Sequence, residues 1–76
     1  MLELTFKFDS LKNAMDFYGS LKEDLKIEKD IFLFETIHET HIILVPKSDK
    51  IAEMATDVSS RFSVKSIENK FIEDNS

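Results

Sequence analysis

Two histidines, His38 and His41, are the side chains best suited to acid–base or metal chemistry in this chain. They stand three residues apart, with Glu39 between them and Glu35 three residues before His38. Imidazole and carboxylate groups can together transfer protons or hold a zinc ion. On an extended segment, however, a spacing of three does not place both imidazoles on one side. We therefore interpret them as polar residues flanking an exposed turn, and we predict neither a metal site nor catalytic residues there.

Other patterns of catalysis and cofactor binding are absent from the sequence. The chain has one glycine, Gly19, and no cysteine. A single glycine cannot build a Walker loop, a dinucleotide fingerprint or the GXXG clamp of a KH domain. The lack of cysteine removes thiol catalysis and cysteine-based zinc sites. We therefore expect a binding module without cofactors rather than an enzyme.

The two histidines interrupt the longest apolar stretch of the chain, which predicts a hairpin of strands over residues 31–38 and 41–46, ended by Pro46. Alternate residues of a strand point to opposite faces, and here both faces are apolar. One face can belong to the domain's core, whereas the other needs a cover that so short a chain hardly supplies. We predict that this second face pairs with another subunit through Phe32, Phe34, Ile43 and Val45.

The N-terminal third of the chain predicts a strand followed by a helix. Residues 2–8 alternate apolar and polar side chains, which is typical of a strand with one buried face. Asp9 and Ser10 can cap the helix that follows over residues 10–25, and its apolar residues recur at helical spacing. We expect this helix to lie on the sheet.

The C-terminal segment predicts a second helix over residues 49–71, capped by Ser48 or Asp49. One apolar stripe would face the core, and a second one, with a line of small residues beside it, would face outward. We predict that this outward surface binds a partner through Ala52, Thr56, Ser59, Arg61, Phe62, Ser63, Val64 and Ile67. The alternative is that the helix ends near Arg61 and that residues 62–67 form a fourth strand, in the order βαββαβ.

These elements predict a single α+β domain over residues 1–76, with the order β-α-β-β-α. It would hold a three-stranded antiparallel sheet with two helices packed on one face. The net charge is −5 and Arg61 is the one arginine, which argues against direct binding of nucleic acid. A stand-alone small RNA-binding domain that uses its sheet face remains the alternative function. No stretch resembles a membrane span or a signal peptide, so we expect a cytoplasmic protein.

Several segments resemble a known family. They are the first strand LELTFKF, the helix SLKNAMDFYGSLKEDL, the hairpin, the Ser-Asp connection and a last helix carrying Asp57-Val58-Ser59-Ser60-Arg61-Phe62. Together they are similar to the small dimerising subunit of the KEOPS complex, the CTAG/Pcc family. Arg61 fits the family's Asn-Ser-Leu-Leu-Arg-Trp-like run, with Asp57 in place of Asn and Phe62 in place of Trp. Ser59 and Ser60 replace larger residues.

The resemblance implies a non-catalytic accessory subunit. KEOPS makes the threonylcarbamoyl modification of adenosine 37 in tRNA. Its small subunit pairs through sheet edges and packs its helices on the catalytic ATP-binding subunit. The resemblance therefore implies a KEOPS small subunit as partner, in a homodimer or, as the substituted serines favour, a heterodimer formed by a diverged paralogue. The catalytic subunit is a further possible partner, and tRNA is contacted only indirectly.

Overall fold

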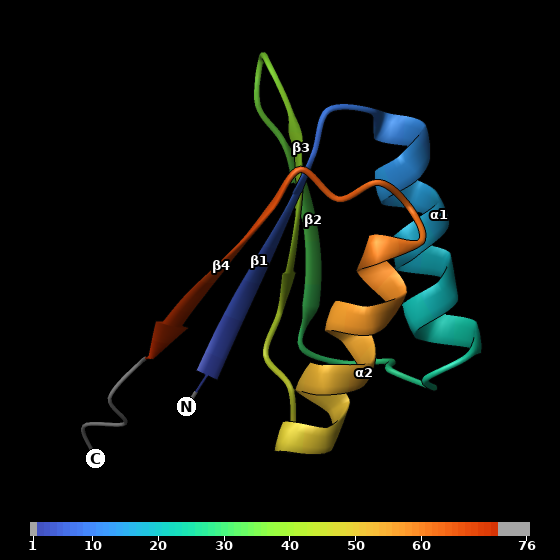
Figure 1. Cartoon of the computed structure of the whole chain (residues 1–76), viewed down its shortest axis with the longest axis vertical. Coiled ribbons are helices and arrows are strands. Elements are labelled where there is room, and N and C mark those ends of the chain that lie inside the picture. Colours follow the sequence, from blue (N-terminus) through green and yellow to red (C-terminus); the bar gives the residue numbers. More distant parts are fainter. Residues whose placement is uncertain (1, 72–76) are drawn as a thin grey trace.

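The computed structural model describes residues 2–71 as an α+β fold with four strands and two helices (Figure 1). The elements are β1 (Leu2–Phe8), α1 (Leu11–Glu23), β2 (Ile31–Glu35), β3 (Thr40–Leu44), α2 (Asp49–Ser60) and β4 (Ser66–Phe71). The sheet has the strand order β2-β3-β1-β4, and each neighbouring pair is antiparallel. This is the split β-α-β, or ferredoxin-like, arrangement.

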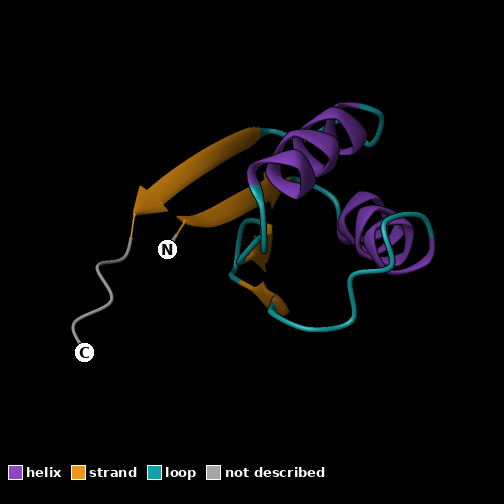
Figure 2. Ribbon diagram, turned by 90° about the horizontal axis from the view of Figure 1, so that it is seen from below, coloured by secondary structure: helices purple, strands orange, loops and turns teal. Residues whose placement is uncertain are grey.

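Both helices lie on the same side of a twisted sheet (Figures 1 and 2). The alternation in β1 explains why, because Leu4, Phe6 and Phe8 all point to that side and are almost completely buried. Phe17 of α1 packs on them, with its ring centroid 4.8 Å from that of Phe6 and 5.4 Å from that of Phe8. Each fully buried side chain of this kind stabilises the fold by about 1.5–3 kcal/mol. The core therefore lies between the sheet and the helices.

Serine side chains set the first residues of both helices. The hydroxyl oxygen of Ser10 accepts the backbone N–H of Asn13 at 3.4 Å, and that of Ser48 accepts the N–H of Ile51 at 3.2 Å. Both cap residues have extended backbones. Each cap satisfies one of the amides that a helix start leaves free, which is worth about 1 kcal/mol.

The predicted helix over residues 49–71 is wrong, and so is the three-stranded sheet. Helix α2 ends at Ser60, and Ser63 has a left-handed backbone with φ of 56°. The hydroxyls of Ser59 and Ser60 donate to the carbonyls of Thr56 and Asp57 at 2.7 Å each, which are acceptors that a continuing helix would use. Serine hydroxyls and one left-handed residue thus end the helix a full three turns early.

The chain then returns to the sheet as β4, which pairs with β1 and places Ile67 opposite Phe6. The element order βαββαβ, considered as the alternative, is confirmed. Its fourth strand begins at Ser66 rather than at residue 62, because residues 62–65 form the connection.

Strand β1 has its expected range, residues 2–8, whereas the hairpin strands and α1 are shorter than expected. The hairpin strands span residues 31–35 and 40–44 instead of 31–38 and 41–46, and α1 spans 11–23 instead of 10–25. Ile37 therefore lies in the turn, where it is 95% exposed, rather than on a strand face. None of the helices within residues 2–71 has the length and apolar character needed to cross a bilayer.

Candidate protein-interaction surface

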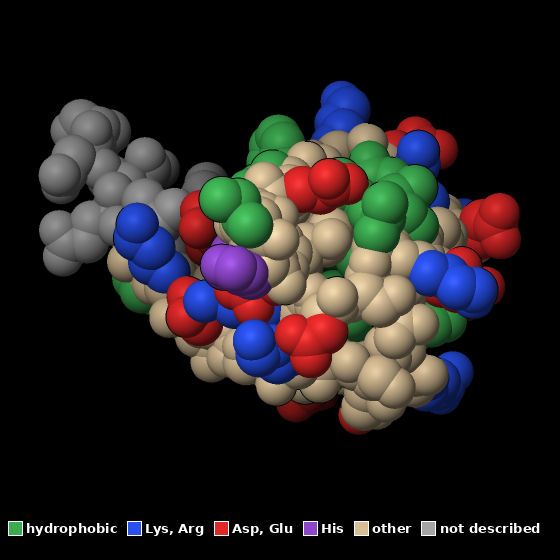
Figure 3. Space-filling model, turned by 90° about the horizontal axis from the view of Figure 1, so that it is seen from above, with side chains coloured by type: hydrophobic (Ala, Val, Ile, Leu, Met, Phe, Trp, Pro, Cys, Tyr) green, Lys and Arg blue, Asp and Glu red, His purple; other side chains and the backbone are tan. Residues whose placement is uncertain are grey.

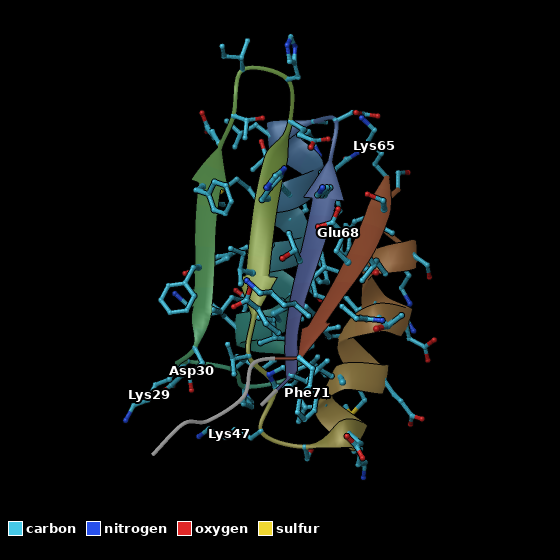
Figure 4. The ribbon with its side chains drawn as sticks, turned by 90° about the vertical axis from the view of Figure 1, so that its left-hand side faces the viewer. Lys29, Asp30, Lys47, Lys65, Glu68 and Phe71 are labelled. Atoms are coloured by element: carbon cyan, nitrogen blue, oxygen red, sulfur yellow. The ribbon has the colours of Figure 1, made fainter. Side chains whose placement is uncertain are left out.

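Within residues 2–71, no element covers the side of the sheet opposite the helices (Figure 4). Figure 4 looks directly onto it, with the four strands in front and the helices behind. The strand register decides which side chains meet there, since directly opposed residues share a face. Two rows cross the four strands, one made of Phe32, Ile43, Thr5 and Glu68, and the other of Phe34, His41, Lys7 and Ser66.

The two halves of this open face differ in character. On β2 and β3 it is apolar, because Phe32 and Phe34 are 56% and 42% exposed and Ile43 lies next to them, half-buried. Toward β1 and β4 it is charged: Lys7 forms an ion pair with Glu68 at 2.6 Å. We call Phe32, Phe34, Ile43 and Val45 the hairpin patch.

The residues of the hairpin patch lie on one face of the sheet, because alternate residues of a strand point to the same side. Phe32 and Ile43 are directly opposed, and Phe34 is opposed to His41. Val45 follows the last residue of β3, and its backbone N–H donates to the carbonyl of Asp30 at 2.9 Å. It is half-buried and closes the patch at that end.

Strand β2 is the outermost strand of the sheet beside the patch, and no other described strand pairs with its outer edge (Figure 4). Hydrogen-bonded pairs alternate along an antiparallel ladder. The backbone N–H of Val45 donates to the carbonyl of Asp30 at one end of the hairpin, and that of Thr36 donates to the carbonyl of Glu39 at the other. Because every second residue of β2 bonds to β3, the backbone groups of Phe32 and Phe34 also point toward β3. The backbone groups of Ile31, Leu33 and Glu35 therefore point away from the sheet.

The opposite edge of the sheet, β4, is of a different kind. Its sequence Ser66–Phe71 reads SIENKF, and most of its side chains are exposed. Charged residues on an edge strand discourage pairing with another chain. Strand β2, with the sequence IFLFE, carries a charge only at its last residue. Of the two edges, β2 is the one suited to pairing.

The two histidines are not brought together. His38 lies exposed in the turn, whereas His41 is on the open face with its ring 4.8 Å from that of Phe34, edge to face. His41 Nε2 is 2.9 Å from Glu39 Oε1. Among residues 2–71 no group of three potential metal ligands is found.

Glu39 belongs to a charged cluster that ties the hairpin turn to the α2–β4 connection. Lys65 Nζ lies 3.3 Å from Glu39 and 3.4 Å from Asp9. The hydrogen bonds from His41 and Lys65 lower the pKa of Glu39, and those to Glu39 and Asp9 raise the pKa of Lys65. Figure 3, which views the molecule from above, shows acidic and basic side chains interspersed on this end of the molecule. The arrangement is that of a surface ion-pair cluster.

Sequence reasoning missed this cluster because it assigned Lys65 to a helix. It also missed Thr36, which organises the turn: its hydroxyl donates to the carbonyl of Glu39 at 2.9 Å and accepts the N–H of Glu39 at 3.0 Å. Thr side chains often stabilise turns in this way, so Thr36 was the available signal in a turn without glycine.

The residues expected to form an outward helical surface lie in different environments. Ala52 and Thr56 remain on an accessible side of α2, but Ser59 is fully buried. The residues from Arg61 onward are not helical. Phe62 packs on Phe17 with ring centroids 6.3 Å apart. The remaining positions are Arg61 at the end of α2, exposed Ser63 and half-buried Val64 in the connection, and half-buried Ile67 in β4.

Ala52 and Thr56 line an open groove between α2 and the β1–β4 side of the sheet, with a volume of about 500 Å³. The side chains of Leu2 and Leu4 form its apolar floor. The other lining residues are Glu53, Asp57 and Asn69. The groove is shallow and carries two carboxylates, so it offers a flank for packing rather than an enclosed ligand site.

No protein-family model matches this chain, and no curated protein is similar to it.

Proposed function

We propose that this chain is a non-catalytic accessory and dimerisation subunit of the KEOPS complex, supporting threonylcarbamoyladenosine modification of tRNA. Its pairing surface is the hairpin patch together with the free edge of β2. The observation that carries the proposal is the exposure of Phe32 and Phe34, 56% and 42%, on an uncovered sheet face beside an unpaired edge.

Physical chemistry favours a protein partner at this surface. Exposed aromatic side chains gain free energy when they leave water, about 25 cal/mol for each Å² of apolar area. An unpaired strand edge adds backbone hydrogen bonds when a second strand joins it. The apolar character of the patch and the accessible backbone of β2 thus act together at one site.

The choice of KEOPS is supported by the sequence resemblance to its small subunits. The proposed first partner is a KEOPS small subunit. The catalytic ATP-binding subunit is a further partner, for which Ala52 and Thr56 offer an accessible flank on α2. Contact with tRNA is indirect, since the open face carries Glu68 and the chain has a net charge of −5.

The proposal is tested by mixing the purified chain with a KEOPS small subunit and with the catalytic subunit, and measuring the mass of each mixture by light scattering after size-exclusion chromatography. We expect a complex with the small subunit. The double variant Phe32→Ser and Phe34→Ser should lose it, whereas Phe71→Ser, which alters a 76% exposed phenylalanine on β4, should keep it. A chain that binds neither subunit would falsify the proposal.

A second candidate function, RNA binding on the sheet face, is favoured by one observation: exposed Phe32 and Phe34 share that face with Lys7. Aromatic side chains on an open sheet can stack on unpaired bases. This function predicts that a fluorescent single-stranded RNA binds the isolated chain and is released steeply as salt rises. We expect no such binding at physiological salt.

A further inference from the structure

We propose that a small pocket at one end of the sheet binds a small organic acid, a carboxylate carried on an apolar tail. The pocket lies between residues 25–29, which lead from α1 to β2, and residues 44–47, which lead from β3 to α2. Both connections lie at the lower end of the molecule in Figure 1. The pocket shares Val45 with the hairpin patch but neither of the exposed phenylalanines, so this inference goes beyond the proposed function.

The interior of the pocket is apolar. Buried Leu44 lines it from the sheet, Leu25 and Ile27 line it from the α1–β2 connection, and Ile51 lines it from α2. Its volume is about 210 Å³. Because a dry cavity of about 150 Å³ holds benzene, this pocket has room for about eight carbon atoms. It therefore fits a short aliphatic tail and is too small for a nucleotide or a peptide.

Backbone hydrogen bonds hold the walls of the pocket in place. The N–H of Ile27 donates to the carbonyl of Leu21 at 3.1 Å, and Lys26 just before it has a left-handed backbone with φ of 56°. This is the Schellman arrangement that ends a helix. The bond of 2.9 Å from Val45 to Asp30 joins the two connections. A preformed pocket does not have to order its own chain when a ligand enters, which favours binding of a small molecule.

The charges at the pocket are mainly positive. Three lysines, Lys26, Lys29 and Lys47, line it against one carboxylate, that of Glu28. The three lysines are exposed, and none forms an ion pair with another residue of the range 2–71. Figure 4 shows Lys29 and Lys47 at the same end of the sheet. Lysine stems can cover apolar surface while their ammonium groups stay in water, so the mouth of the pocket attracts an anion.

The residues at the mouth favour a carboxylate over a phosphate. Arginine forks and glycine-rich backbone nests are common in phosphate sites, and the lining residues include neither arginine nor glycine. Glu28 repels a doubly charged group more strongly than a singly charged one. Lysine ammonium groups are point charges on flexible stems and can close on a single carboxylate. The ligand class is therefore an aliphatic carboxylic acid of about eight carbon atoms.

The first experiment titrates the isotope-labelled full chain with octanoate and follows its backbone amide signals by NMR. Saturable shifts should appear at Ile27 and Lys47, with a dissociation constant on the order of 1 mM for so small a ligand. Octylammonium, which has the same tail and the opposite charge, should bind at least about tenfold more weakly. The absence of saturable shifts at these two residues, shifts centred on Phe34, or equal binding of octylammonium overturns the proposal.

The length of the tail tests whether the pocket is enclosed. Hexanoate leaves part of the pocket empty and should bind about tenfold more weakly than octanoate, because two buried methylene groups are lost. Decanoate exceeds the volume of the pocket and should bind less than about threefold more tightly than octanoate. An open apolar surface would give the same gain for each added pair of methylene groups. A further tenfold gain with decanoate contradicts the pocket.

Charge variants test the lysines at the mouth. Lys29→Glu and Lys47→Glu should each raise the dissociation constant for octanoate about three- to tenfold, because a repulsion replaces an attraction. Lys12→Glu makes the same change of charge at the start of α1, roughly 20 Å from the end of that helix, where salt screens it, and should have no effect. All three lysines are exposed, so the fold should be unaffected. Equal effects of the three variants overturn the proposal.

The last variant fills the pocket. Ile51→Trp should abolish octanoate binding, whereas Lys50→Trp, which adds the same side chain at an exposed neighbouring position of α2, should preserve it. Circular dichroism establishes that each variant is folded. A folded Ile51→Trp chain that binds octanoate normally contradicts the assignment of the pocket. If Ile51→Trp does not fold, the tail series and the lysine variants decide the question.

Discussion

Ser59 is one small residue whose role depends on which side of α2 it occupies. In the sequence it continues a line of small residues that could let a partner helix approach. In the structure its side chain is fully buried, and its hydroxyl donates to the carbonyl of Thr56 at 2.7 Å. A larger side chain there would push against the core rather than block a partner.

Substituting Ser59 by Trp should therefore lower the free energy of unfolding by about 1–3 kcal/mol or more, because it overpacks a filled site. The neighbouring Ser60 is exposed, and Ser60→Trp should stay within about 0.5 kcal/mol of the unaltered protein. Urea unfolding of the two variants makes the comparison. Equal stabilities would mean that Ser59 faces solvent.

The ion pair of Glu39 and Lys65 should make stability depend on pH at both extremes. The pKa of Glu39 is lowered from its usual 4.5, so the contribution of Glu39 is present above that value and is lost as pH falls through the lowered pKa. The pKa of Lys65 is raised from 10.5, so its contribution is present below 10.5 and is lost as pH rises through the raised pKa.

The variant Glu39→Gln should lower the melting temperature slightly at neutral pH and flatten its decline on the acid side. Thermal unfolding monitored by circular dichroism from pH 3 to pH 8 would measure this. Glu23→Gln, which removes an exposed carboxylate from α1, serves as the control and should leave the decline unchanged. An identical acid limb in Glu39→Gln would show that the pair does not contribute.

Among the elements, the end of α2 has the largest consequence for the surface of the protein. Had the helix continued to Phe71, its far side would have been a second docking face. Because it ends at Ser60, the chain supplies β4 instead, which pairs with β1 and becomes the charged edge of the sheet. The apolar edge on β2 is thus the one left for pairing.

A glycine substitution at Ser63 tests whether this residue lies in a connection or inside a continuing helix. The two structures predict opposite changes in the free energy of unfolding. Ser63 has φ of 56°, a conformation that glycine adopts without strain, so Ser63→Gly should raise the free energy of unfolding by about 0.5–1 kcal/mol. Within a helix, the same change would lower it by a similar amount. Glu53→Gly, at an exposed position inside α2, should be destabilising and provides the comparison in urea unfolding.

The described chain packs both helices on one side of its sheet, and no described element covers the other side (Figures 1 and 2). A domain of 76 residues has limited surface to bury, so its stability is small and a partner adds to it noticeably. The exposed phenylalanines on the hairpin patch are the largest apolar contribution to the uncovered side. Association is therefore expected to appear as increased stability.

The melting temperature should accordingly rise with protein concentration, because dimerisation stabilises the folded state by mass action. The double variant Phe32→Ser and Phe34→Ser should show no such dependence, while Phe71→Ser should retain it. Differential scanning calorimetry over a hundredfold concentration range would record the difference. A concentration-independent melting temperature in the unaltered chain would argue against self-association.

Local pattern was sufficient for much of this fold. The alternation of β1, the serine caps and the two apolar faces of the hairpin depend on neighbours in the sequence, and the structure places Leu2–Phe8, Ser10, Ser48 and the hairpin accordingly. The candidate hairpin patch was predictable for the same reason, since a strand of period two sends Phe32 and Phe34 to one face.

Tertiary structure decided the rest. Whether residues 61–71 continue a helix or form a strand depends on β1, which offers a free edge and pairs Ile67 with Phe6, sixty-one residues away in the chain. Helical spacing and strand alternation are both weak signals in this segment, so a long-range ladder outweighs local propensity. The same pairing covers the edge of β1 with the charged strand β4 and leaves β2 as the apolar edge, which no pattern within β2 itself could reveal.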